Sequence, residues 1–302
     1  MIILLIISPI ISFSQQTPPK APKGYFNNTI LKISHALGRL KLIETDFPLP
    51  DNIKEHKDIV YKTVDSKDLK LDIYHKKSIS TTTPLIIFIH GGSWKRGDKQ
   101  EYWPYFISYS EKGYITATIQ YRLSDTAKYP AQIDDIESAI TWIKDNAEKY
   151  HIDKNKIVLV GGSAGGHLAM LTGYSKPHLS IKGIVNLYGP SDLTTEYARN
   201  KDAVIKLMGQ SFEKAPDLYK KASPIFYVSE NTPPTLTFHG TLDELVPYQQ
   251  SDNLDRIIKE AGAISYYHKL KGWPHIMDLS VEVNRYCQYY MDRFFEKYIP
   301  ME

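Results

Sequence analysis

Ser163 lies in a glycine-rich segment, residues 161–166, whose sequence is GGSAGG. The apolar run 157–160 precedes this segment and the helix-compatible stretch 167–171 follows it, which predicts a strand, a sharp turn and a helix. Glycines two residues before and after Ser163 allow the helix to pack close to the strand, and the strained turn lifts the serine hydroxyl above the sheet edge. A serine held in this way can act as a nucleophile.

A second glycine turn favours chemistry over an ordinary glycine-rich turn at Ser163. The residues HGGSW, 90–94, follow directly after another apolar run, 85–89. A glycine turn in this position aims backbone N–H groups at an oxyanion. Both motifs therefore lie in the context that catalysis by a serine requires.

The two motifs resemble those of serine esterases of the α/β-hydrolase fold, close to the hormone-sensitive-lipase-like carboxylesterases and the bacterial acetylxylan and feruloyl esterases. The resemblance covers about residues 58–300. In that family an acidic residue follows a strand after the nucleophile, and a histidine follows the last strand. The segments 234–247 and 272–275 match those places and imply Asp243 and His275. One departure is Ser93, which replaces the third glycine of the family's loop. The N–H donor is kept, but the side chain makes a close approach to this backbone harder.

The resemblance implies acyl transfer through a covalent acyl-enzyme on Ser163. His275 would take the serine proton and later give it to the leaving alkoxide, while Asp243 would hold the imidazole and stabilise the imidazolium. Backbone N–H groups would bind the negative oxygen of the tetrahedral intermediate. The expected donors of this oxyanion hole are those of Gly92, Ser93 and Ala164.

Asp192 is a rival for the acid, because it also follows a predicted strand. Its alternative role is in a turn or a helix cap, and the residues around Asp243 match the family motif better. Arg122 and Asp134 resemble an internal ion pair of the family, for which a structural role is expected.

Aromatic residues near the predicted site are candidates for substrate binding. The chain has 22 tyrosines and four tryptophans, and an aromatic surplus either stacks on sugars or fills the core. We expect Trp94, Trp103 and Tyr121 to contact substrate. No closely spaced His, Cys and Asp cluster occurs, nor does a nucleotide-binding loop, so neither a metal nor a cofactor is expected.

Alternating strand and helix patterns predict the elements that must position these residues. The first two strands resemble an antiparallel hairpin, and the later ones, separated by helices, require parallel pairing. A sheet of about eight strands, mostly parallel, with helices on both faces follows, together with a helix over 131–150 and a short lid between residues 187 and 233. The short lid indicates an accessible cleft. The predicted strands are 59–64, 69–74, 85–89, 114–120, 157–160, 181–187, 235–238 and 264–270.

The N-terminal segment is typical of an exported protein. Residues 2–11 are apolar but shorter than a membrane span of ~20 residues, and small residues suit cleavage after Ser14. We expect a signal peptide over 1–14, with an uncleaved anchor or a buried strand as alternatives, because the segment lacks Lys and Arg. A linker and an amphipathic helix from Ile30 follow over 15–57. The helix either caps the site or packs on the hydrolase domain, residues 58–302.

Composition bounds the remaining possibilities. The net charge of +3 over 302 residues suggests neither nucleic acid nor an anionic membrane as the main partner, and no stable membrane association is expected after cleavage. Cys287 is the one cysteine, so no intramolecular disulfide can form, and it is expected in the core. The oligomeric state is left open.

The patterns favour a secreted or periplasmic carboxylic ester hydrolase that acts on short acyl groups, acetyl or feruloyl, of a small-molecule or polysaccharide ester. A serine peptidase or amidase, such as an arylformamidase-like enzyme, is the alternative that shares the Ser-His-Asp arrangement. A hydrolase-like binding protein without catalysis is the third hypothesis. The complete order of Ser163, Asp243 and His275 weighs against it.

Overall fold

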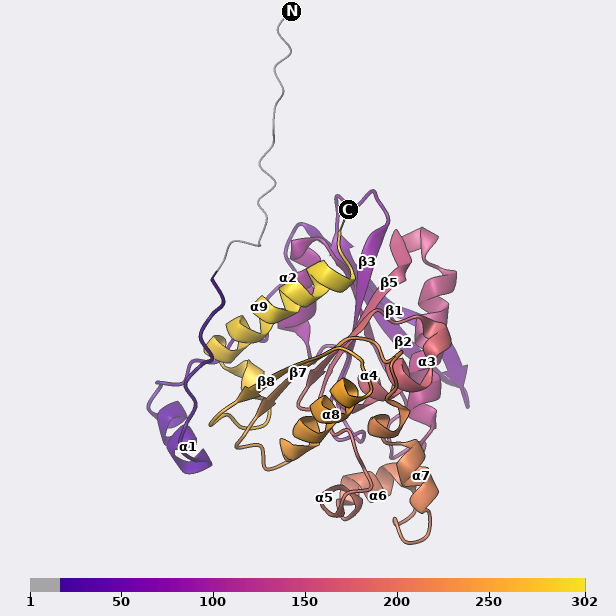
Figure 1. Ribbon diagram of the computed structural model, residues 1–302. Coiled ribbons are helices and arrows are strands. Elements are labelled where there is room, and N and C mark those ends of the chain that lie inside the picture. Colours follow the sequence, from indigo (N-terminus) through magenta and orange to yellow (C-terminus); the bar gives the residue numbers. More distant parts are fainter. Residues whose placement is uncertain (1–16, 302) are drawn as a thin grey trace, which may run out of the picture.

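An eight-stranded sheet forms the centre of the molecule, with helices on both of its faces (Figure 1). The computed structural model describes residues 17–301, so the predicted signal peptide lies outside the described residues. The strand order is β1-β2-β4-β3-β5-β6-β7-β8; β1 and β4 pair antiparallel with β2, and all later pairs are parallel. The expected α/β-hydrolase sheet is therefore confirmed. Its strands are β1 (Ile53–Val64), β2 (Lys67–Lys76), β3 (Thr83–Ile89), β4 (Ile115–Ile119), β5 (Ile152–Gly162), β6 (Gly183–Leu187), β7 (Thr235–Gly240) and β8 (Ser265–Leu270).

The central strands are mostly apolar because both of their faces are covered. Every residue of β3, β4 and β6 is buried. Strands buried on two sides read as continuous Val, Ile and Leu runs rather than as alternating patterns. The edge strand β8, by contrast, is half-buried over most of its length.

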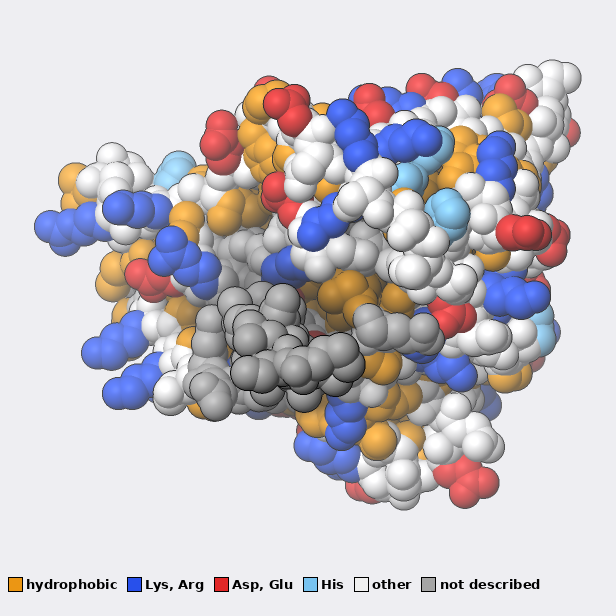
Figure 2. Space-filling view, turned by 90° about the horizontal axis from the view of Figure 1, so that it is seen from above, with side chains coloured by type: hydrophobic (Ala, Val, Ile, Leu, Met, Phe, Trp, Pro, Cys, Tyr) orange, Lys and Arg blue, Asp and Glu red, His pale blue; other side chains and the backbone are white. Residues whose placement is uncertain are grey.

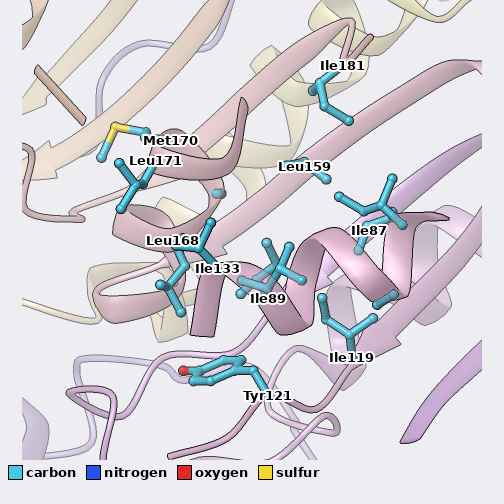
Figure 3. Close-up of a cluster of buried hydrophobic side chains, with 14 of the residues drawn as sticks. Ile87, Ile89, Ile119, Tyr121, Ile133, Leu159, Leu168, Met170, Leu171 and Ile181 are labelled. Carbon is cyan, nitrogen blue, oxygen red and sulfur yellow. The ribbon is translucent and has the colours of Figure 1, made fainter. Parts of the chain in front are cut away.

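Two layers of helices complete the core. One layer, α3, α4 and α8, packs on one face of the sheet, and the other, α2 and α9, packs on the opposite face. Figure 3 shows the first interface, where Ile87, Ile89 and Leu159 of the strands point toward Ile133 and Leu168 of the helices. These helices are α2 (Trp103–Lys112), α3 (Ala131–Asp145), α4 (Ala164–Ser175), α8 (Gln249–Glu260) and α9 (Val281–Tyr298).

The segment between β6 and β7 carries three short helices, which gather at one end of the molecule in Figure 1. They form the short lid that the sequence predicts. The lid helices are α5 (Glu196–Arg199), α6 (Asp202–Met208) and α7 (Pro216–Lys221). Single turns of 3₁₀ helix are η2 (Glu148–Tyr150), η3 (Pro177–Leu179), η4 (Pro224–Tyr227) and η5 (Met277–Leu279).

Helix α3 corrects one predicted ion pair. Arg122 binds Asp135, not Asp134, through two hydrogen bonds of 2.8 Å from Nε and Nη2. Asp135 is buried and Asp134 is exposed, because adjacent helical residues point about 100° apart. The role remains structural, as expected. The helix itself ends at Asp145, and η2 occupies the end of the predicted range.

The N-terminal helix α1 (Asn28–Ala36) stands apart from the sheet (Figure 1). None of its residues is buried, and its apolar Ile30 and Ile33 are 44% and 53% exposed, so it neither packs its apolar face on the body nor lines the cavity described below. Asn28 Nδ2 attaches it by donating to Leu242 O at 3.2 Å. The sheet begins at Ile53, five residues before the predicted start of the hydrolase domain.

Charges are mixed on the surface. On the face seen in Figure 2, Lys and Arg side chains lie interspersed with Asp and Glu, in keeping with the slight net charge of +3. No helix within residues 17–301 has the length and apolar character needed to span a membrane.

Candidate active site

Ser163 lies at the sharp turn between β5 and α4. Its φ of 54° and ψ of −122° are strained for a residue with a side chain, at a cost of about 1–3 kcal/mol. The neighbouring glycines are required by close contacts. A Cβ on Gly161 would lie 2.4 Å from the Gly165 carbonyl, and one on Gly165 would lie 2.0 Å from Ile89 O. The turn therefore has the strand–turn–helix geometry predicted from the sequence.

The structure brings Ser163, His275 and Asp243 together. Ser163 follows β5, Asp243 follows β7 and His275 follows β8, and the carboxyl ends of parallel strands meet at one edge of the sheet. His275 Nδ1 donates to Asp243 Oδ2 at 2.6 Å, which leaves Nε2 to accept from Ser163 Oγ at 3.0 Å. This arrangement can withdraw the serine proton and hold the resulting imidazolium.

The Asp243 carboxylate is held in its ionised form. Oδ1 accepts from the N–H groups of Leu245 and Val246, at 2.9 and 2.8 Å. Burial by itself would raise the pKa of Asp243, but hydrogen bonds from His239 and His275, the charge of His275 and the Val246 N–H outweigh it and lower the pKa to about 2. The carboxylate can therefore only accept hydrogen bonds near neutral pH.

His239 supports this carboxylate. Its Nε2 lies 3.1 Å from Asp243 Oδ2 and 2.9 Å from Val246 O, and its Nδ1 lies 2.7 Å from Ser251 Oγ. The two acceptors at Nε2 favour a proton there, with Nδ1 accepting from the serine. The contact with Val246 O holds the loop that follows Asp243. The contact with Asp243 is additional.

The glycine loop, residues 90–102, presents N–H groups to the same space. Gly92, Ser93 and Trp94 have positive φ values of 91°, 55° and 58°, and Ser93 and Trp94 line the cavity at Ser163. Within the described chain the N–H groups of Gly92, Ser93 and Ala164 donate to no backbone or side-chain acceptor. That of Ala164 also lies at the positive end of α4. These donors can receive an anionic oxygen.

Two of the three residues predicted to contact substrate, Trp103 and Tyr121, do not line the cavity at Ser163. Trp103 packs against Phe47, Tyr74 and Phe106, in the aromatic cluster on the α2 side of the sheet. It does not line the cavity at Ser163. The residue begins α2, and helix packing turns its ring away from the site.

Tyr121 supports the glycine loop instead of lining the cavity. Its buried hydroxyl donates to His90 O at 2.9 Å and Gly91 O at 3.2 Å, and its ring stacks on His90 with centroids 4.2 Å apart.

Trp94 does line the cavity, although it is only 4% exposed. Its Nε1 donates to His167 Nδ1 at 3.2 Å, which fixes the ring as a wall.

Asp192 has the turn role that was its alternative. Its Oδ1 accepts from the N–H and hydroxyl of Thr194, at 2.8 and 2.6 Å. It makes no hydrogen bond to His275 within the described chain. The turn instead meets α8, where Gln250 Oε1 accepts from the Asp192 N–H at 2.8 Å.

A cavity of about 290 Å³ opens beside Ser163. Its floor includes Ser93, Trp94 and Ala164, and lid residues of α5 and α6 form its roof. Tyr197 is the lid residue that sequence reasoning missed: its hydroxyl is buried without a hydrogen-bond partner, and Lys201 Nζ lies 4.3 Å from its ring centroid. No pattern in the sequence marks which lid residues face inward. Within residues 17–301 no group of three or more His, Cys, Asp or Glu is placed to hold a metal ion.

Comparison with known proteins places this geometry among esterases. The BD-FAE family model matches residues 71–258. Esterase LipQ of Mycobacterium tuberculosis (strain ATCC 25618 / H37Rv) is 31% identical over 234 residues, which cover 70% of this chain and 55% of the esterase. The chain spans about half the length of the curated relatives that it matches.

Two solved structures are similar over most of the chain. A truncated carbohydrate esterase from gut microbiota has a TM-score of 0.67 and 25% identity, and covers 82% of this chain and 100% of its own. The esterase Est2 of Thermogutta terrifontis, with propionate bound, has a TM-score of 0.70 and 25% identity, and covers 84% of this chain and 97% of its own.

Proposed function

Since the chain belongs to the BD-FAE family of α/β-hydrolases, we propose that it is a carboxylic ester hydrolase in which Ser163, His275 and Asp243 act as a catalytic triad. The observation that carries the proposal is the pair of hydrogen bonds that joins Asp243 to His275 at 2.6 Å and His275 to Ser163 at 3.0 Å. The strained serine and the unoccupied N–H donors beside it add support.

The proposed reaction has two acyl-transfer steps. Ser163 Oγ attacks the ester carbonyl carbon while His275 Nε2 takes the serine proton, and the oxyanion accepts hydrogen bonds from backbone N–H groups. The bond to the alcohol oxygen then breaks, and His275 returns the proton to the leaving alkoxide. Water attacks the acyl-enzyme in the same way and releases the acid. Each N–H donor, those of Gly92, Ser93 and Ala164, contributes roughly 3 kcal/mol to lowering the barrier.

Short acyl esters of carbohydrates are the substrates we propose. A cavity of about 290 Å³ under a short lid has room for acetyl or feruloyl groups and little room for a long alkyl chain. Similar solved structures point the same way, since one is a carbohydrate esterase and another holds bound propionate. Neither the acyl group nor the alcohol follows from the fold alone.

A labelling experiment combined with a substrate panel tests this function. The purified chain should form a covalent adduct with a fluorophosphonate at Ser163, and Ser138→Ala, which removes a hydroxyl bonded only to the Asp134 carbonyl, should label equally. The panel is p-nitrophenyl acetate, a palmitate ester, acetylated xylan, methyl ferulate and a prolyl amide. Turnover of acetate or ferulate esters is expected. Faster turnover of the amide would assign a peptidase or amidase, and no labelling would assign a binding protein.

We also propose that the chain is exported, with cleavage after Ser14. The support is the apolar run 2–11 followed by small residues. Mass spectrometry of the protein from the periplasm or culture medium should find Gln15 at the N-terminus. An intact Met1 in the active protein would contradict this.

A further inference from the structure

Asp278 is a buried carboxylate beside the site that has no part in the proposed reaction. It lies in η5, three residues after His275, and is 2% exposed. No lysine or arginine forms an ion pair with it within the described chain. A buried charge without a partner is unfavourable, so the surroundings of this carboxylate need an explanation.

Tyr188 joins Asp278 to the imidazole of His275. The Tyr188 hydroxyl donates to Asp278 Oδ1 at 2.6 Å. The ring of the same tyrosine contacts the ring of His275, with centroids 4.6 Å apart and an angle of 59° between the planes. Tyr188 is itself 2% exposed and follows β6, where its N–H donates to Phe238 O at 2.9 Å. A single rigid ring therefore connects the carboxylate to the general base.

The hydroxyl end of Tyr188 is also packed against the nucleophile turn. A Cβ on Gly162 would lie 3.2 Å from the Tyr188 hydroxyl and 2.1 Å from that of Tyr102. Tyr105 of α2 faces Asp278, and its buried hydroxyl forms no hydrogen bond of ordinary geometry. Its place after β6 and the turn after β5 thus hold Tyr188, while α2 faces the carboxylate that Tyr188 binds.

His275 is the one basic group among those that act on the Asp278 carboxyl. Burial raises the pKa of Asp278, and the Tyr188 hydroxyl, its own backbone N–H, Tyr105 and the charge of His275 act against that rise. Glu101 and Cys287 also face this carboxyl; burial raises the pKa of each, and the charge of Asp278 adds to the rise. The imidazolium of the catalytic cycle is therefore a positive charge that forms beside Asp278.

We propose that Asp278, acting through Tyr188, is a positioning residue for His275 whose negative charge favours the imidazolium formed during ester hydrolysis. The inference rests on the proposed triad. Asp243 holds one edge of the imidazole through Nδ1, and the Tyr188 ring, fixed by Asp278, holds its face. The negative charge of this second carboxylate, bound to the hydroxyl of the ring that contacts His275, adds to the stabilisation of the positive charge without touching substrate.

Asp278→Asn tests the charge while keeping the shape and an acceptor for the Tyr188 hydroxyl. Loss of the negative charge disfavours the protonated imidazole in the free enzyme, so the acidic limb of kcat/KM against pH should move to lower pH by about half a unit to one unit. The plateau kcat should fall about tenfold, because the imidazolium of the transition state is stabilised less, and KM should change little.

Two further variants keep the test decisive. Tyr188→Phe retains the ring on His275 and removes the bond to Asp278, so its loss of kcat should be less than additive with that of Asp278→Asn. Tyr109→Phe is the matched control, since it removes another buried hydroxyl of α2, on a ring that packs against Phe295 instead of His275, and it should keep the wild-type pH profile. Unchanged pH limbs in both Asp278→Asn and Tyr188→Phe would overturn the inference, even if stability fell. A wild-type chain without esterase activity would instead refute the proposed function.

Discussion

At the scale of single residues, four donors hold the carboxylate of Asp243. They are two backbone N–H groups and the imidazoles of His239 and His275, at 2.6 to 3.1 Å. These bonds determine the orientation of the carboxylate, and they keep its pKa at about 2 despite burial. We propose that the Asp243 carboxylate holds His275 in the tautomer that leaves Nε2 free to accept from Ser163.

Asp243→Asn should therefore lower kcat by roughly 10⁴, because an amide stabilises the wrong tautomer of His275. Asp192→Asn should have a far smaller effect, since that side chain bonds only its own turn. The measurement is kcat on p-nitrophenyl acetate for both variants, alone and with His275→Ala. Asp243→Asn should add little to His275→Ala, because triad members act as a unit. Equal losses from the two aspartate variants, or full additivity at Asp243, would contradict the assignment.

The pKa of Asp243 also predicts a pH dependence of stability. Its folded-state pKa of about 2 lies below the ordinary 3.8, so its ionisation stabilises the fold above about pH 4, and this contribution is lost as the pH falls toward 2. A shift of that size corresponds to about 2 kcal/mol. Denaturant unfolding between pH 5 and pH 2 should show the wild type losing about that much more than Asp243→Asn. Parallel curves for the two proteins would refute the prediction.

The residues that the sequence could predict share one property. Ser163, Asp243 and His275 each follow a strand, and glycine or turn residues beside them are visible in the sequence. Trp103 and Asp134 lie in helices instead, and no residue beside them shows which way they point. Packing alone decides which side of a helix faces a neighbour. Asp135, one position along, is the residue that reaches Arg122.

At the scale of elements, the glycine loop is anchored by a buried ion pair. Lys99 is 9% exposed and donates to Asp72, which is fully buried in β2, and to Asp58 at 3.0 Å. Glu101 Oε2 accepts from the Gly91 N–H at 3.1 Å, closer to the oxyanion donors. These contacts fix the loop that would bind the oxyanion, although none of them reaches substrate.

Lys99→Met should destabilise the fold by about 3–5 kcal/mol, because it leaves the buried charge of Asp72 without its cation. It should also lower kcat more than it raises KM, since a looser loop presents its N–H donors less well in the transition state. Denaturant unfolding and steady-state kinetics measure the two effects. Lys206→Met, which removes an exposed pair with Asp125, is the control and should change neither. Equal behaviour of the two variants would show that Lys99 does not anchor the loop.

The lid predicts selectivity for acyl length. Its helices α5 and α6 roof a cavity of about 290 Å³, so a long alkyl chain has no enclosed place to lie. We expect kcat/KM for acetate or butyrate esters to exceed that for palmitate in a p-nitrophenyl series. The opposite order would indicate a lipase and would require the lid to open.

Element boundaries show where sequence patterns stop being informative. Apolar runs located all eight strands, but β5 begins at Ile152, five residues before the apolar run, because Ile152 continues the pairing with β3 through Thr83. The amphipathic pattern from Ile30 predicted a helix, and α1 is there. The periodicity of the sequence could not show that the apolar side of α1 remains exposed, since exposure depends on which other elements pack against the helix.

At the scale of the whole molecule, the parallel strands bring the site together. Ser163, Asp243 and His275 are far apart in the chain, yet each follows one of the strands β5, β7 and β8 at the same edge of the sheet. The resemblance of the sequence to α/β-hydrolases implies this arrangement. It could not imply the buried group of Asp278 and the tyrosines, because those residues come from three elements and carry no shared motif.

The central claim is that Ser163 is the nucleophile of an ester hydrolase, and the kcat of Ser163→Ala tests it most directly. Its hydroxyl contributes chemistry and little packing, so the variant should keep the wild-type melting temperature. On p-nitrophenyl acetate its kcat should fall by about a million-fold, the typical cost of removing such a nucleophile. A folded Ser163→Ala protein that retains most of the wild-type kcat would contradict the account.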